Sequence, residues 1–104
     1  VDVDDVVTAC ELSATRFNLK PEIFNIGSGV SRTVDDVVDA FELAAGVEIP
    51  RNPGAFEARP VDVAQWCADI SKARCELGWS PSIGLVESAA RILRSESTAR
   101  LASV

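Results

Sequence analysis

The sequence predicts a small, partial α/β fold in which short strands alternate with helices and some strands pair in parallel. Two observations support this. First, 22–26 is a short apolar run of β-favouring residues, and 61–68 alternates imperfectly between apolar and polar residues. Second, segments of helical period lie between and after them, so each strand would return through a helical crossover. The strands are too few for a complete dinucleotide-binding fold.

Apolar residues at spacings of three and four predict the helices. We expect helices from residue 6 to about 17, at 34–45, at 70–77 and from about 85 to 93, followed by a frayed tail at 95–104. Thr33 should cap the second helix and Gly46 should end it, and Asp69 should cap the third. Asp4 or Asp5 should accept from the first turn of the first helix.

Composition narrows the class of function. Ten basic against sixteen acidic residues give a net charge of −6, which repels nucleic acids and anionic membranes. The chain has no histidine and no tyrosine, so a histidine-assisted nucleophile, a histidine zinc site and a tyrosinate base from this chain are excluded. Cys10, Cys67 and Cys75 lack metal or redox spacing and are expected to be small buried hydrophobes in a reduced, cytoplasmic compartment.

A series of short motifs carries a family resemblance. In order they are Val3-Asp4-Asp5-Val6-Val7, Phe24-Asn25-Ile26-Gly27-Ser28-Gly29, Arg59-Pro60-Val61-Asp62-Val63, Ala68-Asp69-Ile70-Ser71-Lys72-Ala73 and Glu76-Leu77-Gly78-Trp79. In that order they resemble the C-terminal third of the NAD-dependent nucleotide-sugar epimerase and dehydratase family, which belongs to the extended short-chain dehydrogenases. The resemblance covers the chain up to about Leu93.

The resemblance implies a two-part enzyme. Its N-terminal Rossmann domain binds NAD through a glycine-rich turn and uses a Tyr-x-x-x-Lys pair for proton transfer, and this sequence contains neither element. We therefore expect no catalytic residue here, no NAD bound by this chain alone, and no activity from the isolated chain. Residues 1–60 would pack on the Rossmann lobe and 61–94 would belong to the substrate lobe.

The predicted substrate-binding residues are Arg59 and Asp62. The family's Arg-x-Gly-Asp element places its arginine on the substrate diphosphate and its carboxylate on the nucleotide ribose, so the resemblance implies that this pair binds a nucleotide sugar, with a UDP-sugar as first choice. Val61 replaces the family's glycine, and a β-branched residue does not readily take the positive φ that glycine permits. The alternative is a solvated ion pair between the two side chains.

Other features are expected to be structural. The Gly27-Ser28-Gly29 turn lacks the third glycine and the downstream acidic residue of a dinucleotide fingerprint. Trp66 and Trp79 are each expected to fill the core or its rim. The acidic runs at 2–5 and 35–39 lack the pattern of a calcium loop and suit helix N-termini.

Three functions remain open on the sequence. The chain is the nucleotide-holding part of an epimerase or dehydratase, with NAD bound by the rest of the enzyme. Alternatively, it is a free-standing, non-catalytic binding module. In the third case an exposed apolar face, normally covered by the Rossmann half, makes the chain self-associate.

Overall fold

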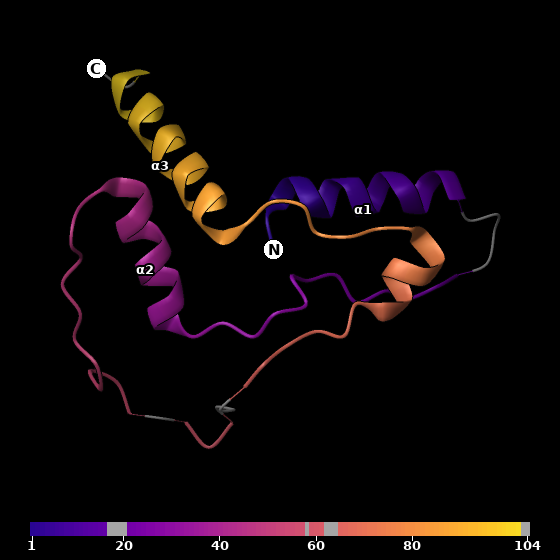
Figure 1. The fold of residues 1–104 in the computed structure, drawn as a ribbon, viewed down its shortest axis with the longest axis horizontal. Coiled ribbons are helices and arrows are strands. Elements are labelled where there is room, and N and C mark those ends of the chain that lie inside the picture. The colour runs from indigo at the N-terminus through magenta and orange to yellow at the C-terminus, as the bar shows by residue number, and fades with distance from the viewer. Residues whose placement is uncertain (17–20, 58, 62–64, 103–104) are drawn as a thin grey trace.

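The computed structural model describes residues 1–16, 21–57, 59–61 and 65–102. The described residues form four helical elements, in chain order (Figure 1): α1 (Val3–Arg16), α2 (Val34–Ala45), the π-helix η1 (Ala73–Leu77) and α3 (Leu85–Ala102). Two helical residues lead into η1. Long connections join these elements, and the described residues include no strand.

The α/β prediction is therefore wrong. The segment 22–26 has no strand assignment, and neither has any described residue of 61–68, of which 62–64 lie outside the described residues. A strand exists only through a ladder of backbone hydrogen bonds to a neighbour, whatever the β propensity of its side chains. No part of the chain that the structure describes supplies such a neighbour, so the described architecture is helical.

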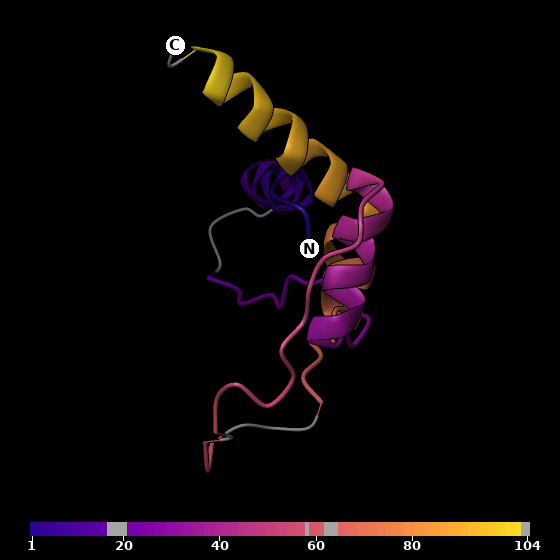
Figure 2. The same cartoon turned by 90° about the vertical axis from the view of Figure 1, so that its left-hand side faces the viewer.

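The chain forms an open, flat arrangement. Its radius of gyration is 17.3 Å and its extents are 49 × 42 × 21 Å, whereas a compact domain of this length has a radius of gyration of about 13 Å. Helix α3 packs on α2, and η1 packs on α1. Figures 1 and 2 show that the connection from α2 to η1 forms a wide loop that extends away from the helices. Two small packed units are thus joined by long connections.

The core lies between α1 and the segment around η1. Its buried residues are Ala9, Ile70, Ala73, Leu77 and Trp79, with Leu12, Phe24, Ile26 and Ala68 packed partly buried against them. The indole of Trp79 is 1% exposed. Its Nε1 donates to the Asp5 carbonyl oxygen at 2.8 Å, which satisfies the polar end of the ring.

The exposure of the tryptophan and cysteine side chains contradicts two further expectations. The packing prediction for Trp79 is confirmed, but that for Trp66 is wrong, because Trp66 is 79% exposed. Cys10, Cys67 and Cys75 are all exposed rather than buried. Residue type alone does not determine burial, since the core of an open chain is too small to cover every apolar side chain.

Asp5 joins α1 to the segment that leads into α3. Its buried carboxylate accepts from the Ser82 amide at 3.0 Å, the Ser82 hydroxyl at 2.9 Å and the Ile83 amide at 3.0 Å. These hydrogen bonds, led by that from Ile83, lower the pKa of Asp5 against the opposing effect of burial.

The residue that caps the start of α1 is Asp2, which accepts from the Asp4 amide at 2.9 Å. The prediction of Asp4 or Asp5 as cap is therefore wrong.

The ends of α2 match the prediction. The Thr33 hydroxyl accepts from the Asp36 amide at 3.1 Å, and the Asp36 carboxylate accepts from the Thr33 amide at 2.8 Å, which completes a capping box. Gly46 ends the helix with φ of 71°. Helix α3, in contrast, continues to Ala102, beyond the expected end near residue 93.

Candidate functional site: an arginine-bearing loop between α2 and η1

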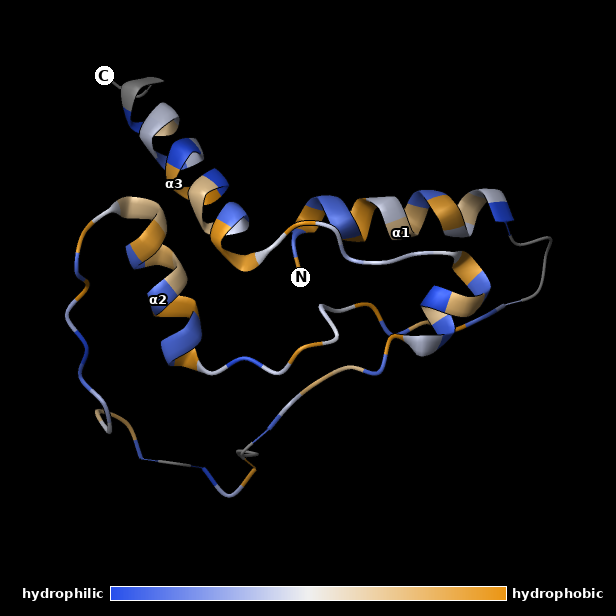
Figure 3. Ribbon diagram, viewed as in Figure 1, coloured by the Kyte–Doolittle hydropathy of each residue, from blue (hydrophilic) through white to orange (hydrophobic). Residues whose placement is uncertain are grey.

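A long loop connects α2 to η1 (Figure 1). Arg59 lies on this loop by its position in the sequence. Every described residue from 52 to 67 is exposed, and hydrophobic residues occur along this loop as well as in the helices (Figure 3). A turn shapes its first part, where the Ala55 amide donates to the Asn52 carbonyl at 3.3 Å and Gly54 has φ of 74°. Arg59 is thus an exposed residue of a loop that begins with a turn.

The structure does not test the pairing of Arg59 with Asp62. Asp62 lies outside the described residues, and Val61, which separates the two in the predicted motif, is 76% exposed. Substrate contact by Arg59 and Asp62 stays a prediction, as does the ion-pair alternative.

Arg51 anchors the beginning of the loop on α2. Its Nη1 lies 3.2 Å from Asp35 Oδ1, and its Nη2 lies 2.5 Å from Asp39 Oδ1 and 3.1 Å from Glu42 Oε2. The second oxygen of the Glu42 carboxylate, Oε1, accepts from the Ile49 amide at 3.0 Å. The hydrogen bond with Asp39 is the largest cause of the raised pKa of Arg51. One guanidinium thus binds three carboxylates on one helix face.

Asp69 and Lys72 anchor the end of the loop. Asp69 Oδ1 accepts from the Ser71 amide at 2.9 Å, just before the helical turns that lead into η1, but η1 itself has no side-chain cap. Hydrogen bonds from Ser71 lower the pKa of Asp69. Lys72 Nζ donates to Glu22 Oε2 at 2.8 Å and to the Ile23 carbonyl at 2.9 Å, and the hydrogen bond to Glu22 raises the pKa of Lys72. The loop therefore ends on a segment held by polar contacts.

The Gly27–Gly29 turn lies against that segment and does not fit a dinucleotide phosphate. A Cβ on Gly29, whose φ is 74°, would lie 3.0 Å from Ile70 Cδ1, and one on Gly27 would lie 3.2 Å from Ala68 Cβ. The glycines thus permit close packing within the chain. A phosphate cradle needs a helix that opens directly at the turn. Helix α2 begins only at residue 34, and the amide of its cap residue Thr33 already donates to the Asp36 carboxylate.

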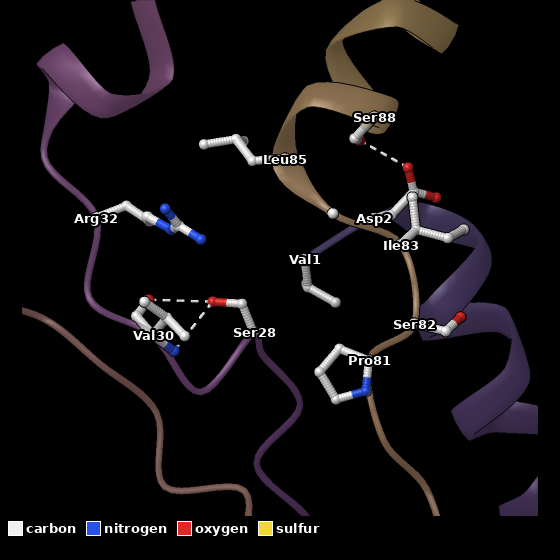
Figure 4. A pocket seen from close by; sticks show the side chains of 11 residues that line it. Val1, Asp2, Ser28, Val30, Arg32, Pro81, Ser82, Ile83, Leu85 and Ser88 are labelled. Carbon is white, nitrogen blue, oxygen red and sulfur yellow. Dashed lines mark hydrogen bonds between the residues drawn. The ribbon is translucent and has the colours of Figure 1, made fainter. Parts of the chain in front are cut away.

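A cavity of about 300 Å³ lies between this turn and the start of α3 (Figure 4). Arg32 and Ser28 line it from the side of α2, and Pro81 and Leu85 line it from the side of α3. Asp2 also lines it, but its carboxylate already accepts from the Ser88 hydroxyl at 2.6 Å and from the Asp4 amide. The cavity combines an arginine, hydroxyls and apolar walls.

Sequence reasoning missed the roles of Arg51 and Lys72. A signal for Arg51 was present, because residues 35, 39 and 42 are all acidic at helical spacing and a basic residue follows the helix end. No comparable signal marks Lys72, whose partner Glu22 is 50 residues away in sequence.

Among the described residues, no group of three acidic, cysteine or histidine side chains is placed to hold a metal ion. No described helix is long and apolar enough to cross a membrane.

Comparisons with known proteins agree with the resemblance. The chain is 40% identical over 81 residues to UDP-glucose 4-epimerase of Caenorhabditis elegans, covering 78% of this chain and 23% of the relative. It is 38% identical over 77 residues to UDP-glucose 4-epimerase of Bacillus subtilis, covering 74% of this chain and 22% of the relative. No family model matches the chain.

A solved structure gives the same result. The chain superposes on UDP-glucose 4-epimerase from Bifidobacterium longum, determined in complex with NAD⁺ and UDP, with a TM-score of 0.78 and 31% identity. The match covers 90% of this chain and 28% of that chain. The chain thus spans less than a third of the length of these relatives. It belongs to the NAD-dependent nucleotide-sugar epimerase family typified by UDP-glucose 4-epimerase and matches the C-terminal part of those enzymes.

Proposed function

We propose that this chain is the nucleotide-sugar-binding part of an NAD-dependent epimerase and is catalytically inactive by itself. The observation that carries the proposal is the similarity to UDP-glucose 4-epimerases over 78% of the chain, together with the exposed loop that bears Arg59. NAD, bound by another part of the enzyme, would oxidise a sugar hydroxyl to a ketone. This chain would contribute to catalysis by holding the nucleotide in place.

The chemistry of Arg59 and Asp62 suits this task. A guanidinium offers a planar set of donors to diphosphate oxygens, and an ionised carboxylate accepts from the two adjacent ribose hydroxyls. The net charge of −6 disfavours a dianionic ligand at long range, so binding requires a local cation such as Arg59. The absence of tyrosine from this sequence means that the proton-transfer base has to come from elsewhere in the enzyme.

An exposed apolar stripe on α1 supports a role as one part of a larger assembly. Val3 and Val7 are 71% and 48% exposed, and Cys10 and Ala14 continue the stripe at spacings of three and four. The opposite side of α1 carries Ala9, which is buried in the core. We infer that the NAD-binding part of the epimerase covers this stripe. Self-association through the same stripe is the alternative.

The test compares nucleotide binding by arginine variants. The upstream coding sequence is read, the complete epimerase is expressed, and UDP and UDP-glucose are titrated by calorimetry. Arg59→Ala should weaken binding by about 10- to 100-fold, because it removes charge-assisted hydrogen bonds to the diphosphate. Arg59→Lys should recover part of the affinity. Arg94→Ala, which removes an exposed arginine from α3, is the matched control and should bind as wild type.

The outcomes separate the three functions. An unchanged dissociation constant for Arg59→Ala would remove Arg59 from the site. Saturable UDP-glucose binding by the 104-residue chain, without an upstream NAD-binding part, would favour the free-standing module. Concentration-dependent association in analytical ultracentrifugation without nucleotide binding, abolished by Val7→Glu, would favour self-association through α1.

A further inference from the structure

Arg51 and Arg59 lie on the same loop, eight residues apart, but their surroundings differ. Arg59 is on the exposed outer part of the loop. Arg51 is held at its beginning, where its guanidinium lies within 3.2 Å of three carboxylates of α2. The charge of such a guanidinium is already paired with carboxylates. Arg51 is therefore an anchor of the loop rather than a second contact for a ligand.

The anchor fixes the direction in which the loop leaves α2. Gly46 reverses the chain, and the Ile49 amide and Arg51 then bind Glu42, so that 47–51 runs back along the helix. Arg51 reaches Asp35, in the first turn of α2, which sets how far the chain returns. Figures 1 and 2 both show this segment lying along α2.

Beyond Arg51, the described side chains of the loop are not buried. The described side chains at 52–57, 59–61 and 65–67 are all exposed, including Phe56 and Trp66. Where buried apolar contacts are lacking, polar contacts contribute more to the orientation of a loop. At the two ends of this loop, these contacts are the Arg51 cluster on α2 and the Asp69–Lys72 segment. The second end also packs on the core through Ile70, whereas the first is held by the polar contacts of Arg51 and the Ile49 amide.

Charge adds a second reason for an arginine at this position. Asp35, Asp39 and Glu42 place three negative charges on one face of α2, and without Arg51 they would repel each other and an approaching diphosphate. Lysine would supply the charge but not the planar fork that reaches several carboxylates at once.

We propose that Arg51 is a positioning residue for nucleotide binding: by fixing the start of the loop on α2, it holds Arg59 where a nucleoside diphosphate is bound. This inference rests on the proposed function. It adds that affinity for the diphosphate depends on a residue that does not touch it.

The test uses two readouts and a matched control. In the 104-residue chain, time-resolved fluorescence anisotropy of Trp66 reports local motion of the loop, while buried Trp79 gives a constant background. In the complete epimerase, calorimetry measures UDP affinity. Arg91→Gln is the control, because Arg91 also binds three carboxylates, those of Asp2, Asp4 and Glu87, but joins α1 to α3.

We expect Arg51→Gln to increase the fast component of the Trp66 anisotropy decay and to weaken UDP binding about tenfold. Arg51→Lys should fall between wild type and Arg51→Gln, and Arg91→Gln should leave both readouts as in wild type. Unchanged Trp66 anisotropy in Arg51→Gln would overturn the anchoring role itself. Equal losses of UDP affinity in Arg51→Gln and Arg91→Gln would also overturn the proposal, because they would indicate general destabilisation.

The two readouts keep this proposal apart from the proposed function. If wild-type epimerase does not bind UDP, the proposed function fails and the role of Arg51 in binding fails with it, while the anisotropy still shows whether Arg51 orders the loop. If wild type binds UDP and Arg51→Gln binds it equally well with a loosened loop, the positioning role alone fails.

Discussion

The two tryptophans mark two regions of this protein that are stabilised differently. Trp79 is 1% exposed in the core between α1 and η1, whereas Trp66, thirteen positions earlier, is 79% exposed on the loop between α2 and η1. The first region has buried apolar area and the satisfied carboxylate of Asp5. The loop is held at one end by the ion pairs of Arg51 and at the other by Asp69 and its neighbours.

This difference separates stability from binding. A residue in the core contributes mainly to the free energy of unfolding, because its removal leaves a cavity. A residue on the exposed loop contributes little to that free energy and is available to a ligand. Substitutions in the two regions should therefore change different measurements.

The largest effect is expected for Trp79→Ala. Removing the indole leaves a cavity beside Leu77 and takes away the donor to the Asp5 carbonyl, so the free energy of unfolding should fall by about 3–5 kcal/mol. Urea denaturation followed by circular dichroism measures this change. Trp79→Phe keeps most of the apolar volume and should lose less. A small loss for Trp79→Ala would show that the core adapts to the missing ring.

A second large effect is expected for Asp5→Asn, with a distinctive dependence on pH. The amide can accept only through its oxygen and turns donors toward the Ser82 and Ile83 amides, so stability at pH 7 should fall by about 2–3 kcal/mol. Hydrogen bonds lower the pKa of Asp2 and Asp5 in the folded state, led by Ser88 and Ile83 respectively. Their contribution is therefore complete above the unfolded value of about 3.9 and is lost as pH falls through the folded values.

Urea midpoints of the wild type between pH 7 and pH 2 check this dependence. The wild type should lose stability below about pH 4, and Asp5→Asn should lose less over the same range. Parallel profiles for the two proteins would show that Asp5 does not carry the acid sensitivity.

A smaller effect is expected for the capping box of α2. Thr33→Ala removes the acceptor of the Asp36 amide and should cost about 1 kcal/mol in thermal or urea unfolding. Thr98→Ala is the matched control, because the Thr98 hydroxyl donates to the Arg94 carbonyl within exposed α3 and caps nothing. Equal changes in the two variants would contradict a capping role for Thr33.

The smallest effect on stability is expected for Trp66→Ala. Its exposed side chain fills no cavity, so the free energy of unfolding should change by less than about 0.5 kcal/mol. The measurement is the urea midpoint, alongside Trp79→Ala. A loss comparable to that of Trp79→Ala would mean that the loop packs on the protein in solution.

Local features of the fold were predictable because their interactions lie close together in sequence. The capping box joins Thr33 to a residue three positions away, and Gly46 acts through its own φ angle. The first helix was predicted, but its cap was not, because α1 begins at residue 3 and places Asp2 before its first turn. The candidate site was predictable only as a motif. Arg59 lies on the exposed loop between α2 and η1, and Asp62 lies outside the described residues.

The sequence by itself determined the helices that have strong local end signals and, through its motifs, the family. Only the tertiary structure decided which tryptophan is buried, that 22–26 forms no strand, and that Arg51 binds three carboxylates of α2. The physical reason is the distance along the sequence between the residues that interact. A cap or a glycine angle depends on residues within one helical turn, whereas burial, strand pairing and ion pairs depend on which distant segments meet.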